Sequence, residues 1–456
     1  MTGQRRKTAA SWGRYPLTAF DTIAPRSRHE DIRFDGARSY LPHGKGRSYG
    51  DVCLNEGGVL IETAALDRFI SFDATTGEIA CEAGVTLGDI MEVALPRGWF
   101  LPVTPGTKFV TVGGAIANDV HGKNHHREGT FGRHVKSFEL ARSDGSRLLC
   151  SPGENSDWFG ATIGGLGLTG LVTSATLQLK RTASPFVAGQ SIKFGNLDEF
   201  FSLSAESAGS HEYVVSWIDC LGHGESFGRG HFLRANPIGA EEAQARKARA
   251  PRPLPLAAPL TPPFSLVNTW TLKAFNAAYY HRQRARTVEK IWHIDPFHYP
   301  LDAIANWNRI YGPRGFLQYQ VVVPSRDQRD VSEALLAEIS RSGQGSFLVV
   351  LKVFGDIPSP GLLSFPMEGT TLALDFPILG ETTFALLDRL DALAGEAGGR
   401  IYAAKDARQS RETFLRGYPE IDRFREFIDP RMSSSFARRL FPDAGRDHGL
   451  EPGEQA

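Results

Sequence analysis

Glycine-rich loops at three places most restrict what this chain can fold into. The first spans residues 44–51 (GKGRSYGD), the second carries Gly113-Gly114 before the small residues 115–117, and the third spans 163–170 (IGGLGLTG). Backbone without side chains can approach an anion closely, and amides at a helix start carry partial positive charge. One glycine pair alone would fit a tight turn equally well. Three such loops together predict a large cofactor, such as a diphosphate, enclosed by backbone.

A polar cluster, residues 121–126 (HGKNHH), follows the second loop directly. Its histidines could suggest a metal, but their spacing matches no zinc motif and no carboxylate is placed with them. Lys123 would also repel a cation. We therefore predict no metal site, and we expect His121 and Lys123 to contact the cofactor or the substrate.

Length and charge exclude several classes of protein. The 456 residues are enough for two sizeable cores, and Lys+Arg equals Asp+Glu at 51 each, which makes nucleic-acid binding a poor interpretation. The four cysteines are widely spaced and contain no Cys-x-x-Cys pair, which is typical of reduced residues. The basic N-terminus lacks an apolar region, and no run approaches the ~20 apolar residues of a spanning helix. A cytoplasmic protein is the default expectation.

Residues 59–180 are expected to form short strands broken by glycine turns. The pattern predicts a strand over 78–82, a helix that starts at a capping box on Thr86 and ends at Gly98, and a hairpin around Asp144-Gly145. A strand over 171–179 would close this domain. The Rossmann alternation of strand, Gly-x-Gly-x-x-Gly and helix is absent, which argues against a nicotinamide-binding domain.

The second half predicts strand, helix, strand, strand, helix, strand, a ferredoxin-like order with the helices on one side of a sheet. The expected ranges are listed in chain order: 316–323, 324–339, 347–354, 371–376, 382–396 and 400–403. No repeats appear in the sequence. The expected domains are therefore 1–183, 184–399, and a C-terminal part, 400–456, that returns to the first domain and ends in a disordered tail from 443.

The stretch 251–263 (PRPLPLAAPLTPP) is too rich in proline to predict a regular ladder. It lies in an expected flexible loop, about 236–263. One interpretation is a mobile surface loop. The other is a lid over the active site that handles a lipid tail, because Leu254, Leu256 and Leu260 alternate with prolines.

Several strings together resemble the vanillyl-alcohol-oxidase (PCMH) type of FAD-binding fold, and in detail the decaprenylphosphoryl-β-D-ribose oxidases. They are GRSYGD (46–51), PGT (105–107), TVGGAIA (111–117), HGKNHH (121–126), WNR (307–309), YGP (311–313), GFLQYQ (315–320), LLSFP (362–366), DFPI (375–378) and AKD (404–406). The resemblance implies an α+β, two-domain flavoprotein in which an antiparallel-sheet domain binds the substrate.

The resemblance also implies a reaction. We expect FAD-dependent oxidation of the 2′-hydroxyl of a polyprenylphosphoryl-β-D-ribose to the 2′-keto sugar, the first half of epimerisation to the arabinose form used in cell-envelope or glycan synthesis. A separate NAD(P)H-dependent short-chain reductase would complete it. A lipid-linked substrate would bring the protein to a membrane or the cell envelope through peripheral contact.

Alcohol oxidation by a flavin needs groups that take the hydroxyl proton and offset charge. Lys405, which follows the strand over 400–403, is the first candidate, although by residue type alone a surface lysine paired with Asp406 is the commoner case. Lys352 interrupts an apolar strand, where a cation needs a partner. Gln318 and Gln320 share one strand face and predict a polar ligand there. Tyr49 completes the catalytic pair with Lys405.

Further contacts are expected on the resemblance. Beyond Gln318, Gln320 and Lys352, the expected substrate contacts are Lys123, His121, Tyr299, Trp217 and Phe354, although core packing is the default for the two last aromatics. The expected FAD contacts are Gly46, Arg47, Ser48, Tyr49, Gly50, Pro105, Gly106, Thr107, Thr111, Gly113, Gly114, Ala117, Asn118, His121, Gly122, Asn124, Gly167, Tyr402 and Lys405.

Arg47 indicates how the FAD is held. Many relatives in the wider fold place a histidine at this loop position and attach FAD to it covalently, so arginine implies non-covalent binding. Mycobacterial members of this family carry cysteine in place of Ala373 and Asn118 and asparagine in place of Thr371. They also have the histidine and tyrosine of positions 298 and 299 in the opposite order. Catalysis therefore needs no thiol, and substrate contacts at Thr371 are open.

Two other functions stay open from the sequence. One is a stand-alone FAD oxidase of a free polyol, aldonolactone or 2-hydroxy acid, within the wider fold. The other is a non-catalytic protein that binds a sugar lipid. The retained Lys405, Lys352 and 121–126 string argue against the second, and the Gln318/Gln320 strand favours the sugar lipid over the first.

Overall fold

Two sheets carry the N-terminal part of the chain. The structure, a computed structural model, describes residues 7–35, 38–251 and 256–442. The first sheet contains, in spatial order, β1 (Lys7–Ala10), β2 (Leu17–Ile23), β4 (Val59–Glu62) and β3 (Tyr40–His43). The second is antiparallel and contains β5 (Phe69–Asp73), β6 (Glu78–Glu82), β10 (Leu171–Gln178), β8 (Val135–Ala141) and β9 (Arg147–Cys150).

Local sequence signals account for much of this domain. Thr86 accepts a hydrogen bond from the Asp89 amide and the Asp89 carboxylate accepts one from the Thr86 amide, so the predicted capping box starts α1 (Leu87–Ala94). Gly98 ends the following turn with φ of 77°, a conformation that favours glycine. The strand predicted at 78–82 and the hairpin around Asp144-Gly145 are confirmed.

Short helices and strands complete the domain. They are β7 (Trp99–Phe100), α2 (Val112–Ala117), α3 (His125–Glu128), α4 (Ser156–Thr162) and β11 (Lys180–Arg181). The core contains Ile79, Leu87, Ile116 and Phe138, all fully buried or nearly so. This core holds the second glycine loop, which enters α2, against the five-stranded sheet.

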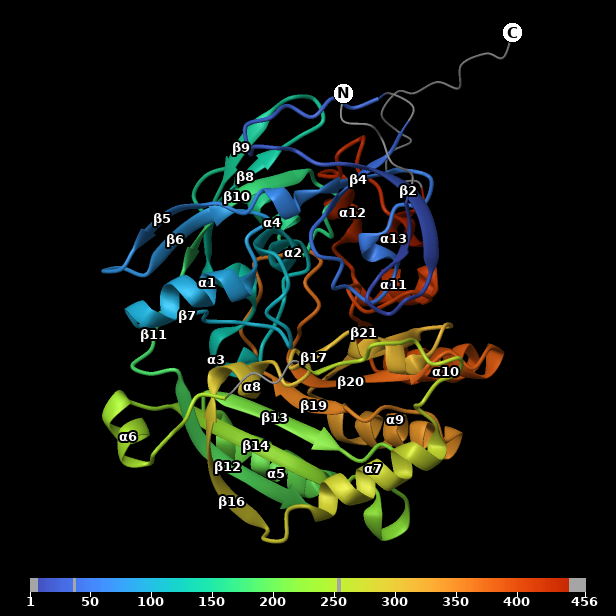
Figure 1. The fold of residues 1–456 in the computed structure, drawn as a ribbon. Coiled ribbons are helices and arrows are strands. Elements are labelled where there is room, and N and C mark those ends of the chain that lie inside the picture. Colours follow the sequence, from blue (N-terminus) through green and yellow to red (C-terminus); the bar gives the residue numbers. More distant parts are fainter. Residues whose placement is uncertain (1–6, 36–37, 252–255, 443–456) are drawn as a thin grey trace.

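An eight-stranded antiparallel sheet forms the second domain, below the first in Figure 1. Its strands, in spatial order, are β16 (Thr287–His293), β12 (Phe186–Phe194), β14 (Gly230–Pro237), β13 (Tyr213–Ile218), β19 (Val350–Phe354), β20 (Gly369–Pro377), β18 (Phe316–Pro324) and β21 (Arg400–Ile401). Its main helices are α5 (Leu197–Ala208), α7 (Thr269–His281), α9 (Gln328–Ser342) and α10 (Glu381–Glu396).

The second half of this sheet is the predicted ferredoxin-like unit. Its strands lie in the order β19, β20, β18, β21, and α9 and α10 connect them. Leu317, Tyr319 and Val321 of β18 pack in one core with the leucines of both helices, so the helices cover one face. β21 belongs to this sheet, which therefore extends past the expected boundary at residue 399.

The first half of the sheet has the same topology, which the sequence did not predict. The order β12, α5, β13, β14, α7, β16 repeats the strand and helix succession, and the spatial order β16, β12, β14, β13 matches that of the second unit. The two units join where β13 pairs antiparallel with β19. The expectation of no repeat holds for the sequence but not for the fold.

The expected loop about 236–263 contains two regular elements among its described residues. α6 (Ala240–Ala245) lies inside the expected loop, and β15 (Leu256–Ala257) pairs in parallel with β17 (Ile304–Ala305). The prediction that this stretch holds no ladder was therefore wrong for two residues, because the pairing uses positions between the prolines. Leu254 and the tail from residue 443 lie outside the described residues.

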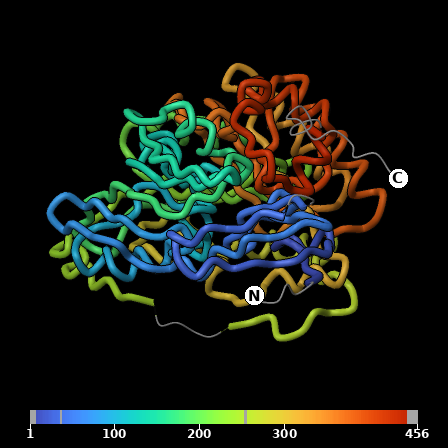
Figure 2. Tube along the Cα trace, turned by 90° about the horizontal axis from the view of Figure 1, so that it is seen from above, coloured from blue at the N-terminus to red at the C-terminus, as the bar shows by residue number. Residues whose placement is uncertain are grey.

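The C-terminal part returns to the first domain, where Figures 1 and 2 place it beside the N-terminal strands. It contains α11 (Arg411–Gly417), α12 (Ile421–Arg425) and α13 (Ser435–Leu440). A further short helix, α8 (Ile294–His298), lies between β16 and β17. Phe414, Phe424 and Phe436 are fully buried in one core with Leu41 and Leu60. The two ends of the chain thus build one domain.

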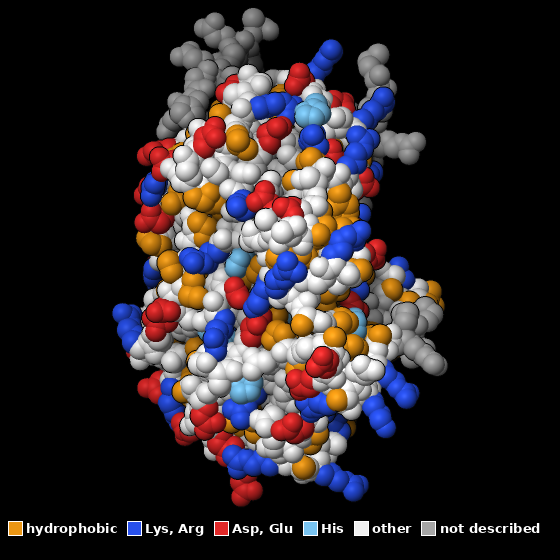
Figure 3. All heavy atoms as spheres, turned by 90° about the vertical axis from the view of Figure 1, so that its left-hand side faces the viewer, with side chains coloured by type: hydrophobic (Ala, Val, Ile, Leu, Met, Phe, Trp, Pro, Cys, Tyr) orange, Lys and Arg blue, Asp and Glu red, His pale blue; other side chains and the backbone are white. Residues whose placement is uncertain are grey.

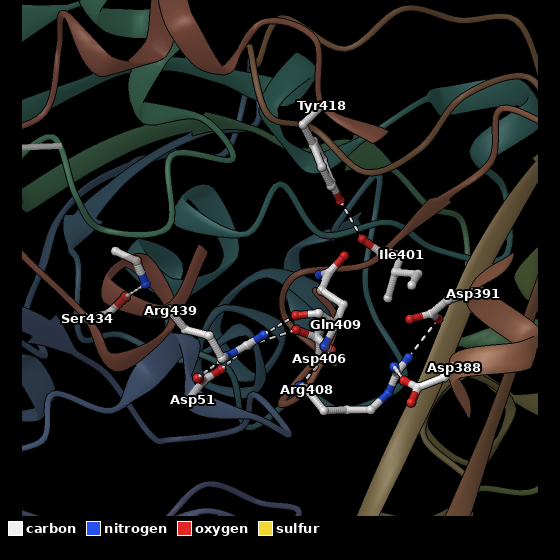
Figure 4. Close-up of polar contacts among 11 residues, drawn as sticks. Asp51, Asp388, Asp391, Ile401, Asp406, Arg408, Gln409, Tyr418, Ser434 and Arg439 are labelled. Carbon is white, nitrogen blue, oxygen red and sulfur yellow. Dashed lines mark hydrogen bonds and ion pairs between the residues drawn. The ribbon is translucent and has the colours of Figure 1, made fainter. Parts of the chain in front are cut away.

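Arg439 of α13 joins three parts of the chain (Figure 4). Its guanidinium contacts the Asp51 carboxylate at 2.8 Å and the Asp406 carboxylate at 2.8 Å, and both carboxylates are almost fully buried. Arg408 continues the network to Asp391 of α10 at 2.6 Å. Burial opposes the charge of Asp406, but Arg439 and Arg408 overcome it and lower the pKa of that carboxyl.

Removing Arg439 should destabilise the protein, because it leaves two buried carboxylates unpaired. We expect Arg439→Ala to lower the free energy of unfolding by roughly 3 kcal/mol, measured by urea denaturation. Arg423→Ala is the control: its ion pair with Asp157 is half exposed on both sides, and such pairs contribute at most about 1 kcal/mol. Equal effects of the two changes would contradict the role given to Arg439.

Candidate active site

A cavity of about 520 Å³ lies between the glycine loops and the bare face of the eight-stranded sheet. Its volume is in the usual range for small-molecule and cofactor sites. One wall comes from residues 42–49, 104–123 and 166–172, and the other from β13, β18, β19 and β20. The three glycine-rich loops therefore meet at one cavity, as predicted from the sequence.

Strand alternation supplies the polar wall. Gln318 and Gln320 of β18, Lys352 of β19 and Asp375 of β20 all point to the cavity, while their neighbours pack against the helices. Cross-strand register brings them together: Gln318 is opposite Asp375, and Lys352 is opposite Thr371. The shared face predicted for the two glutamines is what the structure shows.

Lys352 and His121 form a hydrogen-bonded pair inside the cavity wall. Lys352 Nζ lies 3.0 Å from His121 Nδ1 and donates to the Gly122 carbonyl at 3.0 Å; Gln320 Nε2 lies 3.0 Å from His121 Nε2. Burial, followed by the charges of Lys123 and Lys405, lowers the pKa of Lys352 to about 7. Burial also holds the pKa of His121 well below its ordinary value, which keeps the imidazole neutral.

Lys405 lies at the cavity wall in the turn that follows β21, where Tyr49 contacts it. Its ammonium sits 3.9 Å from the centre of the Tyr49 ring, and the Tyr49 amide donates to the Ala404 carbonyl at 2.9 Å. Burial lowers the pKa of Lys405 to about 7, against the opposing influence of Asp375. Lys405 is therefore poised between its two protonation states near neutral pH. The alternative of a surface ion pair with Asp406 is wrong, because Asp406 pairs with Arg439.

Asp375 is a site residue that the sequence analysis did not single out. Gln318 Nε2 donates to its carboxylate at 2.7 Å and the Tyr311 hydroxyl donates at 3.1 Å. Burial raises the pKa of Asp375 to about 6, although both hydrogen bonds and Lys405 oppose the shift. Asp302, which lines the loop side and accepts from the Lys108 amide, was also missed. A lone aspartate inside a strand pattern gives no signal of its partners.

Most of the expected contacts lie on the cavity wall. They are His121, Lys123, Gln318, Gln320, Lys352, Lys405, Tyr49, Gly46, Arg47, Ser48, Pro105, Gly106, Thr107, Thr111, Gly113, Gly114, Ala117, Asn118, Gly122, Gly167 and Tyr402. The amides of Gly113 and Gly114 are already bonded, to the Ala83 carbonyl and to Thr111 Oγ1. These glycines therefore act by allowing close approach, not by offering free amides.

Two expected cofactor contacts, Gly50 and Asn124, lie behind the wall instead. A Cβ on Gly50 would lie 1.6 Å from the Asp406 carbonyl oxygen, so this glycine lets the first loop touch the C-terminal segment. Asn124 donates to the Pro102 carbonyl at 2.8 Å and is buried below the second loop. Both residues support the cavity without lining it.

Three expected aromatic contacts are also away from the cavity. Trp217 packs on Tyr279 of α7, with ring centres 4.6 Å apart, and its Nε1 donates to the Phe347 carbonyl at 3.0 Å. Phe354 lies under His121 and His125. The Tyr299 hydroxyl pairs with Thr104 Oγ1 at 2.6 Å in the core of the first domain. Alternation along a strand predicts the face of a side chain but not the direction in which its ring turns.

The cavity fits a flavin dinucleotide. Arg47 Nε and Asn118 Oδ1, both on the wall, have no hydrogen-bond partner among the described residues. A Cβ on Gly106 would meet nothing within 4 Å, so the backbone there faces open space. Trp12 and Phe109 flank the Arg47 guanidinium at 4.3 and 5.2 Å. Polar atoms left for a ligand, together with bare backbone, are what a long anionic cofactor requires.

Comparison with known proteins identifies the family. Residues 36–151 match the FAD binding domain model. The chain is 37% identical over 451 residues to a decaprenylphosphoryl-beta-D-ribose oxidase of Mycolicibacterium smegmatis, covering 95% of this chain and 97% of that protein. The chain belongs to the decaprenylphosphoryl-β-D-ribose oxidase family. It is an FAD-dependent oxidoreductase of the type that acts on CH–OH groups, with an α+β, vanillyl-alcohol-oxidase-type fold.

Other relatives are more distant or uncharacterised. An uncharacterized protein from the region 5′ of mprA in Streptomyces coelicolor is 36% identical over 370 residues, 78% of this chain and all of that protein. An alditol oxidase of a Streptomyces species is 28% identical over 171 residues, 37% of this chain and 40% of that protein. The likeness to the alditol oxidase therefore covers a minor part of the molecule.

Proposed function

We propose that this oxidase converts the 2′-hydroxyl of a polyprenylphosphoryl-β-D-ribose to the 2′-keto sugar, as the first half of an epimerisation to arabinose. The observation that carries the proposal is the polar face of the sheet, where Lys405, Lys352, Gln318 and Asp375 surround one cavity opposite the glycine loops. The likeness over nearly the whole chain to an oxidase of that printed name supports the same substrate.

Lys405 is the proposed base. Because its pKa is about 7, a large fraction of the amine is neutral at physiological pH and can accept the proton of the sugar hydroxyl. The Tyr49 ring then stabilises the ammonium by a cation–π contact. Bound FAD supplies the acceptor for the hydride that leaves the alcohol carbon. The raised pKa of Tyr49, caused first by burial, keeps its phenol protonated.

Lys352 and Lys123 are proposed to hold the phosphate of the substrate. Both line the cavity, and burial lowers the pKa of Lys123 to about 8. A bound phosphate would restore the charge of both lysines, since an opposite charge favours the ionised form. Gln318 and Gln320 are left to orient the sugar by hydrogen bonds from the sheet.

The product would need a second protein. A 2′-keto sugar becomes an arabinose only by a stereospecific reduction, and no nicotinamide-binding pattern was found in the sequence. A separate NAD(P)H-dependent short-chain reductase is therefore the proposed partner. No helix among the described residues is long and apolar enough to cross a bilayer. Peripheral contact with a membrane is part of the proposal, because the lipid tail of the substrate resides there.

FAD should be bound non-covalently, because Arg47 occupies the loop position at which a covalent link would need a histidine. Acid precipitation of purified protein should release the yellow colour into the supernatant, measured by absorbance. Colour that stays with the pellet would contradict non-covalent binding. A protein that neither contains nor takes up FAD would contradict the use proposed for the cavity.

Substitution of the two lysines should separate their roles. Lys405→Ala should retain FAD but lower kcat by ~10²–10³, the cost of losing a proton-transfer group. Lys352→Ala should mainly raise KM for the phosphorylated sugar. Lys136→Ala, a change at an exposed lysine, is the control. Wild-type turnover in Lys405→Ala would remove this lysine from the mechanism.

The pH profile tests the protonation state that the base requires. In the wild type, kcat should rise with pH through about 7 and then level off, because only the neutral amine accepts the proton. Asp375→Asn should move this limb to lower pH, since the Asp375 charge raises the pKa of Lys405. A limb that falls with pH would show that the charged form of Lys405 is the active one.

The rim of the cavity should distinguish long from short substrates. Ile304 and Ala305 line the cavity and pair with Leu256–Ala257, so the leucines of this stretch can contact a lipid tail. Leu256→Ser together with Leu260→Ser should raise KM for a long-chain substrate while kcat and short-chain analogues are spared, at about 1.5–3 kcal/mol per leucine fully buried by lipid. Equal effects on both substrates would leave the stretch without a role in lipid binding.

A free polyol or aldonolactone is the second candidate substrate, since the alditol oxidase matches part of the chain. Bleaching of the flavin by alditols, but not by the lipid-linked ribose, would favour it. Lys123, Lys352 and Lys405, which line the cavity, favour a phosphorylated substrate instead.

A further inference from the structure

One long segment of the chain has a strongly one-sided charge. Residues 243–288 contain eight lysines and arginines and no aspartate or glutamate, although the whole chain carries 51 residues of each sign. The segment includes the proline-rich stretch and α7. A concentration of positive charge of this size attracts a polyanion or an anionic surface.

Large apolar side chains are exposed along the same part of the chain. Leu260 is 79% exposed, Phe264 67% and Trp270 84%; Leu256, Leu266, Phe275 and Ile304 are exposed as well. α7 buries little besides Leu272 and Asn276, so most of this helix faces outward. Exposed apolar groups gathered in one region, unlike scattered ones, mark a contact surface. We call residues 256–275 the apolar rim.

Residues 256–266 of the apolar rim are fixed at the mouth of the cavity. Arg309 Nη1 donates to the carbonyls of Ala258 at 3.1 Å and Pro259 at 2.7 Å, and the Leu266 amide donates to the Ile310 carbonyl at 2.8 Å. β15 pairs with β17, whose two residues line the cavity. The exposed Leu256, Leu260 and Leu266 are thus held beside the entrance, and α7 continues the rim from there.

Several of the neighbouring cations lack an ionic partner. Lys247, Arg249, Lys273 and Arg284 are exposed and form no ion pair within the described part of the chain, whereas Arg246 and Arg286 each pair with glutamates. In Figure 3 a projection at the right-hand edge shows hydrophobic side chains with basic ones directly below. Free positive charge therefore accompanies the exposed apolar groups.

We propose that the apolar rim and these lysines and arginines form a docking surface for a bilayer that contains anionic lipid. Apolar and aromatic groups that enter the headgroup region, flanked by cations, are the combination that binds proteins to anionic bilayers. Tryptophan favours this interface in particular. A protein partner or a second copy would need an acidic patch to match, and the rim itself offers none. Docking in this way would present the cavity mouth to the lipid-linked substrate, and that part of the inference rests on the proposed function. The docking itself does not depend on the substrate.

Vesicle co-sedimentation of the FAD-loaded full chain tests the proposal. The protein should bind phosphatidylcholine vesicles with phosphatidylglycerol at least tenfold more strongly than vesicles of phosphatidylcholine alone, and salt should weaken this binding. Phe264→Ser together with Trp270→Ser should reduce binding roughly tenfold or more. Lys273→Glu should reduce it about tenfold on anionic vesicles and leave neutral vesicles unaffected.

Matched variants and a second assay keep the outcomes distinct. The apolar control is Leu149→Ser together with Leu379→Ser, which changes two leucines outside the rim that are 50% and 49% exposed. Arg33→Glu is the charge control. Both control proteins should bind vesicles as the wild type does. No wild-type binding to anionic vesicles, or equal binding by the Phe264/Trp270 variant, would overturn the proposal. So would self-association in gel filtration that this variant abolishes. Vesicle binding by a protein that does not oxidise the lipid-linked ribose would refute the proposed substrate and leave the docking surface standing.

Discussion

The contact of Arg439 with Asp51 and Asp406 is the interaction on which the active site depends. Asp51 ends the first glycine loop and Asp406 follows Lys405, the proposed base, so one guanidinium sets the distance between this loop and this lysine. Gly50 makes this approach possible, because any side chain there would collide with the backbone of residue 406. Lys405 and the first glycine loop are thereby fixed to each other through the far end of the chain.

Local patterns predicted those parts of the fold in which a short sequence determines its own structure. The capping box at Thr86, the turn at Gly145 and the alternation around Gln318 each act within a few residues. The duplicated unit escaped notice because topology can repeat without any repeat in the residues. The ion network escaped notice for a similar reason: Asp51 and Arg439 are 388 positions apart.

The residues of the site likewise fall into those that a local pattern predicts and those that it does not. The polar face of β18 and the lysine in β19 are visible as exceptions to an apolar pattern, and they lie where expected. Asp375 has no such signal, since its importance comes from Gln318 and Tyr311, which reach it across strands. Trp217 shares the face of β13 with Val215, but its ring is held by Tyr279 of α7 and by the Phe347 carbonyl, two contacts with residues far away in the sequence.

The duplicated sheet separates chemistry from architecture. Val215 is the one side chain that the strands of the first unit bring to the cavity, whereas the second unit supplies all the polar groups on the sheet face. The second unit therefore holds the polar groups to which we assign the chemistry, and the first unit is released from that constraint. Changes in α7 and in the segment before it leave the polar groups of the sheet face in place, because none of these groups comes from the first unit. The first unit can therefore change how the protein contacts its surroundings while the second unit keeps the cavity wall unchanged.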